Sequence, residues 1–243
     1  MLKKMSLFDL NDDKMKEECG VFGIFNSEDA AVNTALGLHA LQHRGQEAAG
    51  ITVANGNGYK SHFADGLVGD NFSSIEVVEK LRGDRAIGHV RYSTAGNKKS
   101  VVNYQPINAQ LDLGFISVAH NGNLTNAETL KQELIAGGAI FQSSMDSEVI
   151  IHLISQSKKD NLTDRIIEAV NRIEGAFSLV ILCEDKLIAL RDPYGVRPLS
   201  IGKLGDSIVV ASETCALDII GAEFVRDIKH GEMVTIDNNG IES

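Results

Sequence analysis

The sequence has few cysteines and no long hydrophobic run. Its three cysteines, Cys19, Cys183 and Cys215, form no CxxC pair, so neither a disulfide framework nor a thiolate zinc site is indicated, and a reducing cytoplasm fits best. No apolar run approaches the roughly 20 residues of a membrane-spanning helix. The longest, residues 177–183, already contains Ser178. These absences predict a soluble, cytoplasmic protein.

Excess positive charge is lacking too. Lys and Arg number 23 against 33 Asp and Glu, a net charge of −10, which repels phosphate backbones and anionic membranes. We therefore expect no nucleic acid and no membrane as partner. The phosphate-binding patterns GxxxxGK[ST] and GxGxxG are missing, as is the hydrolase pattern GxSxG. His39 and His43 are spaced like a zinc pair, but Gln42 replaces the glutamate base, which favours a packed or surface pair.

The first eighteen residues differ in composition from the rest. They are densely charged and contain no apolar core of a signal peptide, which predicts a solvated arm. From Cys19 onward, strand-like runs alternate with turns, and hairpins are expected at 176–183 with 187–192 and at 199–202 with 207–211. Four helices are expected: residues 29–42, 125–137 with a capping box at Thr125 and Glu128, a third after Asp146, and one from Thr163 to Gly175.

This order of elements predicts the fold class. Strands that pair by hairpins, with helices in blocks, favour α+β with antiparallel sheets over a doubly wound parallel sheet. The absence of a linker after residue 18 predicts a single domain over residues 19–243.

Cys19 stands where the charged arm changes into the strand-like run CGVFGIF. A lone cysteine is more often a buried structural thiol. If the arm were removed, however, Cys19 would carry an α-amine with a pKa near 8 beside its own thiol. The nucleophile would then bring its own base. Papain-like chemistry is the alternative, but it places the cysteine at a helix N-terminus.

Six motifs resemble one family. CGVFGI, HALQHRGQEAAGI, GHVRYSTAG, VAHNGNLTN, SSMDSE and RDPYGVRPL occur in the order found in class II glutamine amidotransferases. HRGQEAAG resembles the corresponding motif of the amidophosphoribosyltransferase branch, whereas glucosamine-6-phosphate synthases typically have YRGYDSAG at this position. The resemblance implies an N-terminal nucleophile hydrolase fold, two stacked antiparallel sheets flanked by helices (αββα). It also implies a propeptide, residues 1–18, removed autocatalytically to expose Cys19.

The resemblance assigns three catalytic groups. Cys19 would be the nucleophile, and the Asn121 side-chain amide with the Gly122 N–H would form the oxyanion hole. Without the family pattern, Asn121-Gly122 would be taken for a hairpin turn, because Asn-Gly is the commonest dipeptide in such turns.

Four further residues would bind glutamine or support the site. By resemblance, Arg91 holds the α-carboxylate, Thr94 adds a hydroxyl donor, Asp146 accepts from the α-ammonium, and Arg44 buttresses the nucleophile. From the residues alone, Arg91 could be a surface charge, Asp146 the N-cap of its helix, and Arg44 a cation at a helix C-terminus.

The implied reaction is hydrolysis of glutamine through a Cys19 thioester, giving glutamate and ammonia. The family passes ammonia to phosphoribosyl pyrophosphate, making phosphoribosylamine in the first step of de novo purine synthesis. The partner is a C-terminal phosphoribosyltransferase domain that binds Mg²⁺ and is not found in this chain, whose only Asp-Asp pair is Asp12-Asp13. No cofactor is expected in the present domain. A 4Fe–4S cluster, found in some relatives, would also belong to the missing part, and a homo-oligomer is expected at full length.

Two other functions stay open at this point. An uncut arm would leave a non-catalytic assembly or regulatory module, and the domain could also serve a different ammonia acceptor. Asp192, Arg197 and Cys215 are assigned structural roles, because their segments are rich in turn residues.

Overall fold

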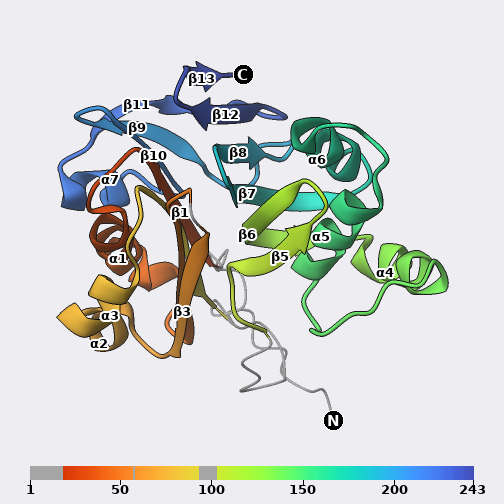
Figure 1. The fold of residues 1–243 in the computed structure, drawn as a ribbon, viewed down its shortest axis with the longest axis horizontal. Helices are drawn as coiled ribbons and strands as arrows, with labels where there is room; N and C mark the ends of the chain where they lie inside the picture. Colours follow the sequence, from red (N-terminus) through yellow and green to blue (C-terminus); the bar gives the residue numbers. More distant parts are fainter. Residues whose placement is uncertain (1–18, 57, 93–102) are drawn as a thin grey trace, which may run out of the picture.

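The computed structural model describes residues 19–56, 58–92 and 103–243, so the predicted propeptide and Thr94 lie outside the described residues. Two antiparallel sheets face each other (Figure 1). The seven-stranded sheet contains β1 (Gly20–Phe25), β2 (Ala48–Ala54), β3 (Tyr59–Asp65), β4 (Arg85–Arg91), β9 (Ser200–Leu204), β10 (Ser207–Ala211) and β11 (Glu223–Asp227), in the order β11-β9-β10-β1-β4-β2-β3. The six-stranded sheet contains β5 (Ile107–Leu111), β6 (Gly114–Leu124), β7 (Gly175–Cys183), β8 (Leu187–Arg191), β12 (Met233–Asp237) and β13 (Gly240–Glu242), in the order β13-β12-β8-β7-β6-β5.

Helices cover the outer face of each sheet (Figure 1). The seven-stranded sheet carries α1 (Ala30–Ala40), the 3₁₀ helix η1 (Gln42–Arg44), α2 (Val68–Phe72), α3 (Ile75–Lys80) and α7 (Cys215–Ile220). The six-stranded sheet carries α4 (Ala127–Ala136), α5 (Ser147–Gln156) and α6 (Leu162–Val170). The predicted α+β class, with two stacked antiparallel sheets flanked by helices, is confirmed. No helix in the described ranges is long and apolar enough to cross a membrane.

Three layers of core explain why the central strands are apolar almost throughout. Alternate residues of a strand point to opposite faces. On β1, Phe22 packs beneath the helices while Val21 enters the core between the sheets. On β6, Val118 faces the helices and Ala119 faces the other sheet. Gly23 lets β1 approach β7, since a Cβ there would stand 2.7 Å from a Val180 methyl carbon.

The helix starts differ from the sequence prediction in two places. The prediction of a capping box at Thr125 and Glu128 is wrong, because α4 begins one residue later. Its N-cap is Asn126, whose side chain makes no capping hydrogen bond. The Thr125 N–H instead donates to the Glu174 carbonyl. α6 begins at Leu162, because the Asn161 side chain accepts the Asp164 N–H and caps the helix there.

The helix ends and the short helices also differ. The predicted last helix ends at Val170 rather than near Gly175, which has a φ of +134° and opens β7 instead. α2, α3 and α7 were not predicted, because five or six residues hold too little of the helical period to be recognised.

The segment RDPYGVRPL carries the chain from β8 of one sheet to β9 of the other. Its Asp192 is fully buried and bonds the backbone of its own loop. The carboxylate accepts the Tyr194 N–H at 2.8 Å and the Val196, Arg197 and Phe177 N–H groups at 3.3 Å. A buried carboxylate with four N–H donors holds a loop in one conformation, which is the structural role expected for Asp192.

Candidate active site

Cys19 immediately precedes β1, and Arg44 holds its backbone from both sides. The Cys19 N–H donates to the Arg44 carbonyl at 3.0 Å, and the Arg44 Nε donates to the Cys19 carbonyl at 2.6 Å. Cys19 has a φ of +61°, in the left-handed region that non-glycine residues rarely occupy. Its Sγ lies 3.8 Å from the Tyr92 carbonyl oxygen, just past the end of β4. Arg44 therefore fixes the backbone where the chain enters β1.

Arg44 is itself buried and held by Glu213, a residue that was not predicted from the sequence. Its Nη1 pairs with Glu213 Oε1, and His43 Nε2 lies 3.1 Å from Glu213 Oε2. Although burial works in the opposite direction, Arg44 and His43 hold the pKa of Glu213 below its usual value. Glu213 belongs to the segment ASETCAL, in which Ser212 Oγ accepts the Val21 N–H at 3.0 Å. This segment thus braces the sheet that carries Cys19.

The strand register brings Arg91 and Asn121 to the same end of the sandwich as Cys19. Gly20 pairs with Val90, so Arg91 follows on the strand beside Cys19. Ile87 on β4 and Ala119 on β6 lie in the core between the sheets. The two-residue period places Arg91 and Asn121 on those same inward faces.

A hydrogen bond joins the two sheets at this end. His89 Nε2 of β4 lies 3.1 Å from the His120 carbonyl oxygen of β6. Arg91 follows His89 by two residues, and Asn121 follows His120 directly. The bond therefore sets the spacing between the strands that carry the two predicted site residues.

Asn121 and Gly122 have the features that an oxyanion hole requires. The Asn121 side chain is fully buried, and neither its amide nitrogen nor its amide oxygen has a hydrogen-bond partner within the described residues. Buried polar atoms are normally paired, so this amide has its full capacity left for a ligand. Gly122 has a φ of +144°, and a Cβ there would stand 2.0 Å from the Ala176 carbonyl oxygen. Only glycine fits at this position.

The direction of the Gly122 N–H follows from its neighbours. The His120 N–H donates to Gln105 Oε1 at 2.7 Å, and the Leu124 N–H donates to Asp146 Oδ2 at 2.9 Å. N–H groups two residues apart on a strand point to the same side. Pairing of β5 with β6 ends at Val118, so this side of β6 has no strand beside it here. The Gly122 N–H points there, between the Gln105 amide and the Asp146 carboxylate.

Asp146 does not cap α5 with its side chain, although it occupies the N-cap position. Its carboxylate bonds β6 instead, and the side chain keeps about a quarter of its exposure. The N-cap interpretation is therefore wrong for the side chain. Asp146 stands as a fixed, partly exposed negative charge beside the Gly122 N–H.

Asn103 links Arg91 to the loop that ends at Asp146. Arg91 Nη1 donates to the Asn103 carbonyl at 3.1 Å. The Asn103 Nδ2 donates to Ser144 Oγ at 3.1 Å, and its Oδ1 accepts the Ser144 N–H at 3.2 Å. Asn103 thus ties the Arg91 side chain to the loop that leads to Asp146.

Two buried histidines, His89 and His120, lie beneath the site and are uncharged. His120 Nδ1 lies 2.9 Å from Ser147 Oγ. Burial, followed by the nearby His120 and Arg91, lowers the pKa of His89 to about 3, and burial also lowers the pKa of His120. Both rings are therefore uncharged at neutral pH and act as hydrogen-bonding spacers between strands.

The low pKa of His89 predicts a loss of stability in acid. In the unfolded chain His89 binds a proton below about pH 6.5, whereas in the folded chain it stays neutral down to about pH 3. Stability therefore falls as the pH drops through 6.5. Between pH 7.5 and pH 5 we expect a loss of about 2 kcal/mol from this group. Urea unfolding at both pH values measures it.

Two variants check the assignment to His89. His89→Gln should show a clearly smaller loss between the two pH values, even if it is less stable at both. The exposed His230, changed to Gln, should keep the wild-type loss. An equal loss in wild type and His89→Gln would contradict the assignment.

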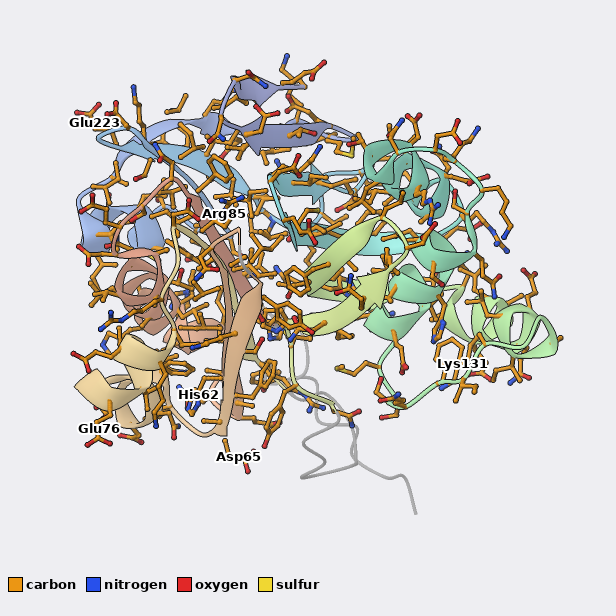
Figure 2. All side chains as sticks on the ribbon, viewed as in Figure 1. His62, Asp65, Glu76, Arg85, Lys131 and Glu223 are labelled. Atoms are coloured by element: carbon orange, nitrogen blue, oxygen red, sulfur yellow. The ribbon has the colours of Figure 1, made fainter. Side chains whose placement is uncertain are left out.

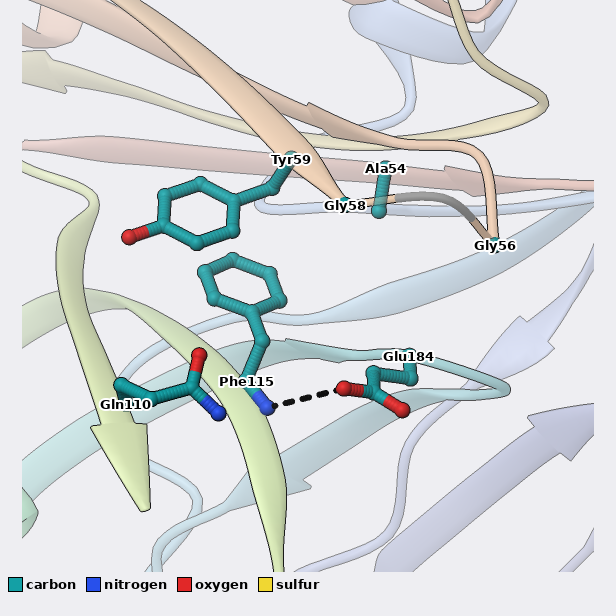
Figure 3. Close-up of a pocket in the computed structure, with 7 residues that line it drawn as sticks. All are labelled: Ala54, Gly56, Gly58, Tyr59, Gln110, Phe115 and Glu184. Atoms are coloured by element: carbon teal, nitrogen blue, oxygen red, sulfur yellow. Dashed lines mark hydrogen bonds between the residues drawn. The ribbon is translucent and has the colours of Figure 1, made fainter.

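A pocket lined by Tyr59, Phe115 and Glu184, drawn in Figure 3, lies at the opposite end of the sandwich. It encloses about 480 Å³, and Tyr59 stacks on Phe115 with ring centroids 3.7 Å apart. The Phe115 N–H donates to Glu184 Oε1 at 3.4 Å. Arg85, labelled in Figure 2, begins β4 at this end, where its guanidinium donates to the Glu184 carbonyl. Since Arg91 ends the same strand, this pocket is not part of the Cys19 site.

Several residues of the site escaped the sequence analysis. They hold other site residues or strands in place through hydrogen bonds and ion pairs: His89, Asn103, Gln105, His120, Ser147 and Glu213. The alternation of the strands carrying GHVR and AHNGN was the available signal for the two histidines. The other four act through contacts between distant segments, which the sequence does not show.

Known proteins are similar to this chain in sequence and in fold. A family model described as a glutamine amidotransferase domain matches residues 89–218. The amidophosphoribosyltransferase of Rhizobium etli is 50% identical over 225 residues, which cover 93% of this chain and 45% of that protein. The chloroplastic amidophosphoribosyltransferase 3 of Arabidopsis thaliana is also 50% identical, over 229 residues that cover 94% of this chain and 43% of that protein.

A solved structure agrees with these matches. The glutamine phosphoribosylpyrophosphate amidotransferase of Bacillus subtilis, complexed with ADP and GMP, superimposes with a TM-score of 0.87 at 45% identity, over 92% of this chain and 48% of that one. The chain spans about half the length of the relatives it matches. The matched family model covers more than half of the chain and includes Arg91, Asn121 and Asp146. The chain belongs to the class II glutamine amidotransferase domain family, in the form found in amidophosphoribosyltransferases.

Proposed function

We propose that this domain hydrolyses glutamine to glutamate and ammonia, with Cys19 as the nucleophile. The observation that carries the proposal is the meeting of Cys19, Arg91 and the Asn121-Gly122 pair at one end of the sandwich. Production of glutamate and ammonia from glutamine by the purified chain, starting at Cys19, tests it. A chain that starts at Cys19, is folded and yields no glutamate would contradict the proposal.

Removal of residues 1–18 supplies the base in this proposal. The freed α-amine of Cys19 takes the place of the backbone N–H that donates to the Arg44 carbonyl, so Arg44 orients it. A thiol at its ordinary pKa is only a few per cent ionised at pH 7. The amine accepts the thiol proton as the sulfur attacks the side-chain carboxamide carbon of glutamine.

The oxyanion formed by this attack accepts hydrogen bonds from the Asn121 amide and the Gly122 N–H. The Cys19 ammonium then gives its proton to the leaving nitrogen, the C–N bond breaks, and ammonia departs. A γ-glutamyl thioester remains on Cys19. Water, losing a proton to the α-amine, attacks this thioester, releases glutamate and restores the thiol. Each proton taken by the amine is thus returned within the cycle.

Arg91 and Asp146 select glutamine in this scheme. The guanidinium binds the planar α-carboxylate, with Thr94 as a further donor, and the Asp146 carboxylate accepts from the α-ammonium. The Arg44 guanidinium keeps Cys19 in its unusual backbone conformation.

Replacement of Arg91 by Lys should raise the KM for glutamine by about 10-fold or more, because a charge-assisted hydrogen bond contributes about 1.5–3 kcal/mol. kcat should change less, since the α-carboxylate is remote from the reacting carbon. Steady-state assays of glutamate release measure both constants. Arg85→Lys, at the other end of the same strand, is the matched control and should keep the wild-type KM. An unchanged KM in Arg91→Lys would contradict this role.

The activity of the longer protein is part of the same proposal. We infer that ammonia passes to phosphoribosyl pyrophosphate on a C-terminal phosphoribosyltransferase domain, giving phosphoribosylamine for purine synthesis. The names of the relatives and the half-length match support this. Mg²⁺ and any 4Fe–4S cluster would belong to that domain, and no step above depends on them. Homo-oligomers are expected for the longer protein. A catalytic thiol that must stay reduced suits a reducing compartment such as the cytoplasm.

A further inference from the structure

A cluster of three potential metal ligands lies behind the nucleophile. His43 Nε2, one carboxylate oxygen of Glu213 and Cys215 Sγ all lie within 4.8 Å of one another. They come from two segments about 170 residues apart, η1 and the ASETCAL turn, which the fold brings together. We propose that these three side chains form a Zn²⁺ site that regulates the domain.

The distances match tetrahedral zinc. Zinc binds nitrogen and oxygen at about 2.1 Å and sulfur at about 2.3 Å, which puts neighbouring ligands about 3.4 Å apart for N and O and about 3.6 Å apart for S and O. His43 Nε2 lies 3.1 Å from Glu213 Oε2, and Cys215 Sγ lies 3.7 Å from the same oxygen. Two edges of the tetrahedron are already in place, and a small movement of Cys215 or His43 closes the third.

The tautomer of His43 also fits a cation. Its Nδ1 lies 3.0 Å from the Ala40 carbonyl oxygen, which can only accept a hydrogen bond, so Nδ1 carries the proton. When Nε2 carries no proton, its lone pair faces the Glu213 carboxylate. Two acceptors this close need a cation between them, either a proton or a metal. A backbone carbonyl on the other ring nitrogen is the usual support of a zinc-bound histidine.

The ligand types select zinc among common divalent ions. Imidazole and thiolate favour Zn²⁺ over Mg²⁺ and Ca²⁺, which prefer oxygen. On binding, Cys215 loses its thiol proton to solvent and coordinates as the thiolate. The His43 side chain is 54% exposed, so ions can enter from solvent and water can complete the coordination. The negative charges of the Glu213 carboxylate and the Cys215 thiolate then balance the two positive charges of the zinc ion.

The site is coupled to Cys19 through one carboxylate. Glu213 Oε2 lies near His43 and Cys215, while Oε1, which is also 3.3 Å from His43 Nε2, pairs with Arg44, whose Nε holds the Cys19 carbonyl. A zinc ion on Oε2 draws electron density from the carboxylate and weakens its hold on Arg44. We therefore expect zinc to inhibit glutamine hydrolysis, a consequence that rests on the proposed function, whereas metal binding itself does not.

Cobalt absorption tests the site without reference to activity. Co²⁺ bound to a thiolate gives an intense near-ultraviolet charge-transfer band. The full chain carrying Cys19→Ala should show this band, because Cys215 is then the accessible thiol and Cys183 is buried. Adding Cys215→Ala should abolish the band and weaken Zn²⁺ binding by more than about 10-fold. A band of equal strength with and without Cys215, or no band in Cys19→Ala, would overturn the proposal.

Inhibition is tested separately in chains with Cys19 intact. Zinc should inhibit glutamine hydrolysis in the wild type, while Cys215→Ala, with wild-type activity in the absence of metal, should need at least about 10-fold more zinc. Equal inhibition of both would place the inhibitory ion on Cys19 and overturn the regulatory role. A chain without glutaminase activity would fail the proposed function alone, since the cobalt band reads the metal site directly.

Discussion

Cys19→Ala should abolish glutamine hydrolysis, lowering kcat by at least about 10⁴-fold, because removal of a nucleophile also removes the covalent pathway. Nothing else in the described site can replace it. The Asn121 amide and the Gly122 N–H stabilise an oxyanion only after a nucleophile has attacked. The residual rate should approach that of uncatalysed hydrolysis. Glutamate release by a folded Cys19→Ala variant at a tenth of the wild-type rate would contradict the assignment.

A matched control separates loss of the nucleophile from loss of a thiol. Cys183 lies in β7, is buried, and its pKa is raised to about 12 by that burial, so it is inert at neutral pH. Cys183→Ala should retain glutamine hydrolysis, apart from a modest loss of stability for the cavity left in the core.

Intact mass gives a second reading of the same prediction. Wild-type chain should lose residues 1–18 and then gain one adduct from an electrophilic glutamine analogue, whereas Cys19→Ala should gain none. An uncut and unlabelled wild-type chain would support a non-catalytic module instead. The mass of the cut chain also locates the first residue, which the proposed base requires to be Cys19.

The layers of the fold could be predicted from the sequence because hairpin turns and apolar alternation are local signals. The run ending at Cys183 reads as a buried strand, and it is one. The helix beginnings were harder to predict. Thr125 and Glu128 have the spacing of a capping box, yet the contact of the Thr125 N–H with Glu174 shifts the start of α4. A tertiary contact thus overrides a local preference.

The sequence predicts site residues only where a reactive group sits inside a motif. Cys19, Arg91 and Asn121 carry groups whose chemistry the family resemblance explains. Glu213 and Asn103 carry no such signal, because their importance lies in contacts with Arg44 and Arg91 that form only when distant segments fold together. The sequence thus predicts reacting groups, whereas the residues that hold them in place are seen only in the structure.

Asn121→Ala should lower kcat by about 10²–10³-fold with little change in KM, since an oxyanion-hole donor acts mainly in the transition state. The variant should also fold at least as stably as the wild type. Its amide is buried without a partner in the described residues, so the folded chain already lacks the hydrogen bonds that this amide makes with water when unfolded. Steady-state kinetics and thermal unfolding together measure the two effects.

Ser117→Ala is the matched control for this prediction. Ser117 lies four residues earlier on β6, points to the same face as Asn121 by strand alternation, and is likewise buried with an unpartnered hydroxyl. Ser117 lies farther from the end of the sandwich that carries Cys19, so loss of its hydroxyl should leave kcat unchanged. Equal losses of kcat in both variants would mean that the strand, rather than the Asn121 amide, supports catalysis. A catalytic loss confined to Asn121→Ala, without a loss of stability, is the result that an oxyanion hole requires.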